Sequence, residues 1–322
     1  MTSEKYAVVF DTNAYRNLTK DLRAEDIKAF IEQLKNKEAA KNIQARATPV
    51  VGMELLANLA GPDKSPHYDD CLKALVAMAN HCYQQKEDLV HLTPHPYLHI
   101  STNFFNSSPL AVELISQNMV GVIMDFKDDY LKAIEGHQFA GTFNNLKKYI
   151  EHEEARWASE MEGYVADAVQ EVLKKHPSLE PKQLRGKVLQ YIDSGYFVPK
   201  LSMAIIFGMA RSLNIRMTGE EHVAKGHALP QAFPMSVAFY QWVCRRIVAD
   251  NLDLQSQRSK DTRWNWRWDY EVSFLMNDHL LNGRIVLLIT SDKDMIQMLR
   301  DYSYDVRVMN LETYLDFLDW KG

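Results

Sequence analysis

The sequence has few cysteines and no apolar run of membrane-spanning length, and we expect no secretory signal. The three cysteines among 322 residues are too few for a disulfide framework and lack the spacing of a zinc site. No apolar run reaches the roughly 18–20 residues that a membrane-spanning helix needs. The N-terminus, MTSEKYAVVF, has neither a basic region nor a long apolar core. We therefore expect a cytoplasmic protein with reduced cysteines and no membrane partner.

An excess of positive charge is also missing. The chain has 37 Lys and Arg against 42 Asp and Glu, a formal net charge of −5. No general basic field therefore attracts nucleic acid, and a polyanionic partner would need a local basic patch or bound metal ions. Hydrophobic residues make up 46% of the chain, which is enough for a substantial core.

Both ends of the chain alternate between strand-like and helix-like segments. Apolar runs rich in β-formers predict strands at 6–10, 45–50, 88–93, 285–290 and 305–309. Helical periodicity predicts helices at 25–37, 51–59, 69–85, 268–282, 293–301 and 311–319. This alternation predicts an α/β fold with a central parallel sheet flanked by helices.

The middle of the chain differs from both ends. It shows almost no strand-like alternation, and helices are predicted at 143–175, 181–193, 199–213 and 235–253. We therefore predict a discontinuous α/β domain made of 1–94 and 262–322, with a mostly helical insertion or cap at 95–261.

Two of the predicted strands end at acidic residues. Asp11 follows the run YAVVF, while Asp292 and Asp294 follow IVLLITS. Ligands of parallel sheets bind beyond the carboxyl ends of the strands, where neighbouring strands would bring these carboxylates together. Glu54 follows the second predicted strand, and Asp269 opens the helix before IVLLIT. Clustered carboxylates need a cation, and oxygen-only ligands favour Mg²⁺ or Mn²⁺.

Four segments resemble, in order, the four motifs of PIN-domain nucleases. These are VVFDTNAY, VGMELLANL, WRWDYEV and LITSDKDM. The last resembles the T-x-D-x-D-F signature of that family, with Met295 where Phe is usual. The resemblance covers 1–94 and 262–322 and excludes the insertion. It implies a PIN-like fold that hydrolyses phosphodiester bonds of RNA, or less often DNA, by two-metal activation of water.

The resemblance also implies roles for individual residues. Asp11, Glu54, Asp269 and Asp292 would be catalytic metal ligands, Asp294 a fifth ligand, and Asn13 and Thr290 supporting hydrogen-bonders, with Mg²⁺ or Mn²⁺ as cofactor. We therefore predict an RNA endonuclease, and a toxin or defence role is compatible with this. Because PIN proteins often act as dimers or as restrained toxins, a homodimer and an inhibitory partner protein are further expectations.

Three of the acidic residues also have a simpler interpretation, and the choice of Asp269 has competitors. Asp11 and Asp292 are suited to cap the helices that follow them. Glu54 could serve the dipole of its helix. Glu271, Asp261 and Asp278 compete with Asp269 for the third motif.

The stretch RWNWRW at 263–268 allows two interpretations. Arg263, Trp264 and Arg267 are candidates for contacts with nucleic acid, because indole rings stack on bases and guanidinium groups bind phosphate. The favoured alternative is structural, with the three tryptophans locking the insertion onto the sheet.

Two other functions compete with a nuclease. One is a catalytically inactive PIN-like module that binds RNA or a protein. The other is a HAD-like phosphohydrolase, although that family needs D-x-D where this chain has Asn13.

Overall fold

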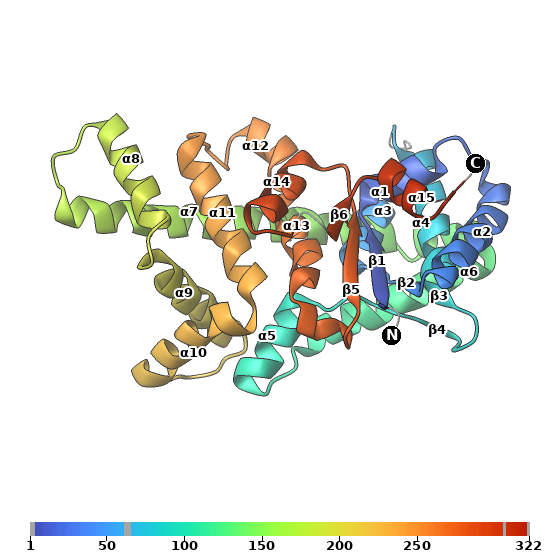
Figure 1. Cartoon of the computed structure of the whole chain (residues 1–322), viewed down its shortest axis with the longest axis horizontal. Helices are drawn as coiled ribbons and strands as arrows, with labels where there is room; N and C mark the ends of the chain where they lie inside the picture. Colours follow the sequence, from blue (N-terminus) through green and yellow to red (C-terminus); the bar gives the residue numbers. More distant parts are fainter. Residues whose placement is uncertain (1–3, 61–65, 305–306, 321–322) are drawn as a thin grey trace. The chain divides into compact units, whose positions relative to one another are not determined.

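The chain forms two compact units. The computed structural model describes residues 4–60, 66–304 and 307–320 (Figure 1). Unit 1 comprises Met1–Pro94, Leu110–Glu151 and Asp278–Gly322, and unit 2 comprises His95–Pro109 and His152–Asn277. Within the described ranges, no helix combines the length and the apolar character needed to cross a membrane.

Unit 1 is built on a small parallel sheet of four strands in the order β2-β1-β5-β6. These strands are β1 (Tyr6–Phe10), β2 (Ile43–Ala45), β5 (Ile285–Ile289) and β6 (Val308–Met309). The central pair, β1 and β5, is in register from Tyr6 opposite Ile285 to Phe10 opposite Ile289. Four of the five residues in each of these strands are buried, as expected for strands covered on both faces. The predicted α/β class with a parallel sheet and flanking helices is confirmed.

The helices of unit 1 include most of those predicted from periodicity. They are α1 (Thr12–Thr19), α2 (Ile27–Ala40), α3 (Pro49–Ala57), α4 (Tyr68–Cys82), α6 (Leu110–Phe139), α14 (Lys293–Asp301) and α15 (Leu311–Phe317). The strand predicted at 45–50 was placed too late in the sequence, because β2 runs from Ile43 to Ala45 and Pro49 already begins α3. Proline favours the first turn of a helix, where its missing N–H is not needed.

The strand predicted at 88–93 was also wrong in extent and pairing. β4 (Leu89–Val90) pairs antiparallel with β3 (Tyr83–Gln84) in a separate two-stranded sheet. Leu92 adds one parallel bridge to Ala47. Asp88, with φ of 52°, reverses the chain before β4 and produces this hairpin. Of the strand predicted at 305–309, β6 contains Val308–Met309, and 305–306 lie outside the described residues.

A fully buried polar network lies in the core of unit 1. The Nε2 atom of His81 lies 2.9 Å from both carboxylate oxygens of Glu38. Tyr314 donates to Glu38 at 2.7 Å, and the Tyr15 hydroxyl lies 3.0 Å from Nδ1 of His81. The ring of Phe10 contacts His81, Tyr15 and Tyr314. This network ties helices α1, α2, α4 and α15 together beside strand β1.

Unit 2 is helical throughout its described elements. These are α5 (Pro96–Phe105), most of α7 (Thr142–Lys175), α8 (Pro181–Ile192), α9 (Phe197–Ser212), α10 (Gly219–Ala232), α11 (Pro234–Ala249), α12 (Gln257–Thr262) and α13 (Trp266–Ser273). The helices predicted at 143–175, 181–193, 199–213 and 235–253 are present. The helix predicted at 268–282 ends earlier, because short 3₁₀ turns follow Ser273.

The division into units differs from the predicted one in two places. Residues 110–151 group with the sheet, whereas we expected them in the insertion. The reason is that α6 packs against α3 and α4, where Gly52 leaves room for Met119. Residues 262–277 group with unit 2, because α13 packs against α11. The boundary at residue 94 is the same in both descriptions.

Candidate active site at the carboxyl edge of the sheet

Asp11 lies at the carboxyl end of β1, beside the end of β5. Its backbone N–H donates to the carbonyl of Ile289 at 3.0 Å, which continues the ladder between the strands. One carboxylate oxygen accepts from the N–H of Ala14 at 2.5 Å, so Asp11 caps α1. The other oxygen accepts a hydrogen bond from the hydroxyl of Thr290. The cap therefore holds the carboxylate at the sheet edge, and the two interpretations of Asp11 do not exclude each other.

Thr290 connects Asp11 with Asp292. The Asp292 N–H donates to the Thr290 hydroxyl oxygen at 3.0 Å. The Asp292 carboxylate in turn accepts from the N–H of Met295 at 2.8 Å and caps α14. Thr290 is only 2% exposed, so its hydroxyl depends on these two partners. The strands thus bring Asp11 and Asp292 to the two sides of one threonine side chain.

Glu54 joins this edge through Thr12, a residue whose role the sequence analysis missed. The Thr12 hydroxyl donates to the Glu54 carboxylate, and Thr12 directly follows Asp11. Glu54 lies in the second turn of α3 and not in the first turn, because α3 begins at Pro49. The D-T-N motif alone could have signalled this role, since its threonine is the first residue of a helix.

Asp294 and Asn13 are the other residues predicted for this edge. Asp294 is in the first turn of α14 and partly buried. The side chain of Asn13 is exposed, and its contribution to Asp11 comes from the backbone N–H, which lowers the Asp11 pKa. Asn13 thus supports Asp11 through its main chain.

The electrostatics of the edge are unfavourable for an ionised Asp11. Burial raises the pKa of Asp11 to about 6, and the like charge of Asp292 adds to this effect. The Thr290 hydroxyl and the backbone N–H groups of Ala14 and Asn13 oppose it only in part. Within the described residues, neither Asp11 nor Asp292 forms an ion pair with a basic side chain. Such a site favours an added cation.

The donor set suits a hard divalent cation, since the carboxylates of Asp11, Asp292 and Glu54 offer only oxygen. Within residues 4–60, 66–304 and 307–320, no group of three or more His, Cys, Asp or Glu side chains is arranged to hold a metal ion. The three acids are instead hydrogen-bonded to protein groups: Thr290, Met295 and Thr12.

Asp269 belongs to unit 2, in the first turn of α13. Its competitor Glu271 is buried and lies 2.7 Å from Arg267 and 3.5 Å from His95. Burial alone would raise the pKa of Glu271, but His95 and Arg267 lower it. The Glu271 carboxylate is therefore ionised, and its charge is balanced by Arg267 inside unit 2. The side chains of the other competitors, Asp261 and Asp278, lie outside the described set.

The stretch RWNWRW packs mainly inside unit 2. Trp266 and Trp268 are 1% and 2% exposed. The guanidinium of Arg267 lies 4.9 Å from the ring centre of Trp268, besides its ion pair with Glu271. Trp264 donates to the carbonyl of Leu254 at 2.8 Å. These contacts are all within unit 2, so the tryptophans pack there and the expected packing onto the sheet stays a prediction. Arg267 has a structural role, while Arg263 stays a candidate for nucleic-acid contact.

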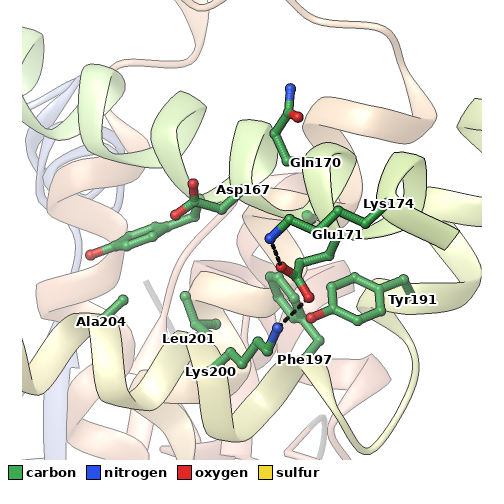
Figure 2. A pocket seen from close by; sticks show the side chains of 11 residues that line it. Asp167, Gln170, Glu171, Lys174, Tyr191, Phe197, Lys200, Leu201 and Ala204 are labelled. Carbon is green, nitrogen blue, oxygen red and sulfur yellow. Dashed lines mark hydrogen bonds and ion pairs between the residues drawn. The ribbon is translucent and has the colours of Figure 1, made fainter. Parts of the chain in front are cut away.

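A cavity of about 200 Å³ in unit 2 contains none of the predicted site residues. Figure 2 shows Glu171 between two lysines, Lys174 at 2.7 Å and Lys200 at 2.5 Å, with Tyr191 beside them. The lysines lower the pKa of Glu171 to about 2. Because these charges satisfy one another and join α7 to α9, the cluster is explained by helix packing.

Comparison of the chain with protein-family models, with curated proteins and with solved structures found no match.

Proposed function

We propose that this protein is a Mg²⁺- or Mn²⁺-dependent nuclease of PIN-like architecture that cleaves RNA internally. The observation that supports this proposal best is the pair Asp11 and Asp292, held on either side of Thr290 at the ends of adjacent parallel strands. The preference for RNA over DNA rests on the motif resemblance.

The side chains of the edge have distinct roles in this proposal. Asp11, Asp292 and Glu54 provide oxygen ligands. Thr290 donates to the Asp11 carboxylate and Thr12 donates to the Glu54 carboxylate, which orients these two ligands. A bound divalent ion would supply the Lewis acid that activates water and neutralises charge on the cleaved phosphate.

The test is cleavage of end-labelled RNA and of DNA with the same base sequence, in Mg²⁺, in Mn²⁺ and in EDTA. We expect cleavage of RNA only with metal. Asp11→Asn and Asp292→Asn should each lower activity by more than the roughly 10–100-fold typical of losing an outer-shell partner. Asp128→Asn is the matched control, because Asp128 is an exposed carboxylate paired with Lys127 at 2.6 Å.

Equal activity of wild type, Asp11→Asn and Asp292→Asn would reject the proposed site. Metal-independent RNA binding without cleavage would instead support a non-catalytic binding module. Turnover of small phosphomonoesters without cleavage of polynucleotide would support a phosphatase.

A further inference from the structure

Arg16 places a positive charge near the acidic edge. It lies on α1, four residues after Thr12, so the two side chains share one face of the helix. Thr12 donates to Glu54 on the same helix face. The thiol of Cys71 lies within electrostatic range of both Arg16 and Glu54. Burial chiefly raises the pKa of Cys71 to about 11, Arg16 lowers it and Glu54 raises it.

The hydrogen-bonding capacity of Arg16 is only partly used. A guanidinium group has five N–H donors. One terminal nitrogen of Arg16 lies 3.0 Å from Nδ1 of His67 and 3.9 Å from the carboxylate of Asp70, the latter too long for a hydrogen bond. The Nε atom is buried without a hydrogen-bond partner in the described part of the chain. The Nε atom is enclosed, but the Arg16 side chain as a whole is 26% exposed, so the outer part of its guanidinium group can still meet an acceptor supplied by a ligand.

A phosphodiester substrate would supply such an acceptor. Carboxylates at the edge repel a polyanion, and the chain as a whole carries a net charge of −5. A guanidinium group binds phosphate oxygens through two parallel hydrogen bonds, which gives both attraction and orientation.

We propose that Arg16 binds a phosphate group of the polynucleotide substrate beside the acidic edge. This inference rests on the proposed nuclease function. Arg16 is then a substrate-binding residue that positions the phosphate backbone of the polynucleotide relative to Asp11 and Glu54. A purely structural Arg16, tying α1 to the start of α4 through His67 and Asp70, is the alternative that the experiment must exclude.

The test measures the salt dependence of binding to a fluorescent single-stranded RNA. Full-length Asp292→Asn protein in Mg²⁺ is the background, because cleavage is blocked there under the proposed function. Adding Arg16→Gln should make the slope of log K against log salt shallower by about 0.7, the value for one lost phosphate contact on a single strand. Adding Arg16→Lys should retain most of the slope, since the charge is kept. In the otherwise wild-type chain, Arg16→Gln should raise KM and leave kcat unchanged.

Arg23→Gln is the matched control. Arg23 is also in unit 1, its side chain is 76% exposed, and it pairs with Glu25. An equal slope for Arg16→Gln and Arg23→Gln would overturn the inference. If Arg16→Gln does not fold, an Arg16→Lys protein with wild-type slope and a raised KM still supports phosphate binding, whereas one with wild-type KM overturns it. Failure of the nuclease proposal is recognised separately, by undiminished cleavage in the Asp292→Asn background.

Discussion

The hydroxyl of Thr290 donates a hydrogen bond to the carboxylate of Asp11, although 279 residues separate them in the sequence. The same hydroxyl accepts from the N–H of Asp292 at 3.0 Å. Thr290 therefore links the carboxylate of Asp11 to the backbone of Asp292, whose own carboxylate carries like charge. Thr290 should therefore affect both the stability of the protein and the pKa of Asp11.

Thr290→Val removes the hydroxyl and keeps the shape of the side chain. We expect a loss of about 1–3 kcal/mol in the free energy of unfolding, because the Asp292 N–H is left without its acceptor. The hydrogen bond from Thr290 also lowers the Asp11 pKa, so its removal raises that pKa. The acidic limb of the pH–rate profile should then move to higher pH. Thr290→Ser, which keeps the hydroxyl, should leave that limb in place, and an unmoved limb in Thr290→Val would contradict this role.

Asp11 makes stability depend on pH. Its pKa is raised from 3.8 to about 6, so between these values the folded protein binds more protons at this site than the unfolded chain. The contribution of Asp11 to stability is therefore present below the unfolded pKa and is lost as pH rises through about 6. Without divalent ions, Asp11→Asn should be more stable than wild type near pH 7 by on the order of 1–3 kcal/mol, with a smaller gain near pH 4.

Denaturant unfolding of both proteins in EDTA, at both pH values, measures this difference. Added Mg²⁺ should stabilise wild type more than Asp11→Asn, because only the carboxylate provides a charged ligand. If the free energy of unfolding depends on pH in the same way for the two proteins, the pKa of Asp11 is not raised by folding.

The buried Glu38 should be essential for the folding of unit 1. Glu38→Leu leaves His81 and the Tyr314 hydroxyl without their acceptor, and we expect a loss of roughly 3–5 kcal/mol. Tyr314→Phe removes one hydrogen bond and should cost only about 1 kcal/mol. Glu32→Gln, an exposed position on the same helix, is the control and should change stability by less than about 0.5 kcal/mol. A Glu38→Leu protein as stable as the control would refute this importance.

Two glycines in unit 2 should respond oppositely to alanine. A Cβ atom on Gly226 would lie 2.3 Å from the Cγ atom and 3.0 Å from the Cα atom of Met203, whereas one on Gly208 would meet nothing within 4 Å. Gly226→Ala should therefore destabilise the packing of α10 on α9 by about 1–3 kcal/mol. Gly208→Ala should stabilise the interior of α9 by roughly 0.4–1 kcal/mol. Thermal unfolding of the two variants distinguishes these signs, and equal midpoints would contradict the expected close contact.

Sequence patterns predicted the parts of unit 1 that are determined by short stretches of the chain, such as apolar runs and helix caps. Apolar runs indicated β1 and β5, and strand-helix alternation correctly made them parallel. The helix α14 was predicted with its observed bounds, because Asp292 is a strong cap and the helix is amphipathic. The positions of Asp11 and Asp292 beside each other followed from the placement of acids at strand ends.

Other features depend on partners that local sequence does not reveal. Periodicity does not say which surface a helix packs against, so the place of α6 in unit 1 was missed. This helix also has exposed apolar residues, including Phe139 at 97%, and a non-helical conformation at Asp129. The bonds that Thr12 makes with Glu54 and Thr290 makes with Asp11 join segments far apart in the chain. Such contacts exist only once the fold brings them together.

The pairing of β1 with β5 has a consequence for the protein during its synthesis. The first strand leaves the ribosome long before its central neighbour has been translated. At roughly 5–20 residues per second, the delay over this span is on the order of 15–55 s. Until then the first strand lacks a hydrogen-bonded neighbour on one side, and Asp11 lacks the hydroxyl that holds it. A nascent or prematurely terminated chain therefore cannot assemble this acidic edge.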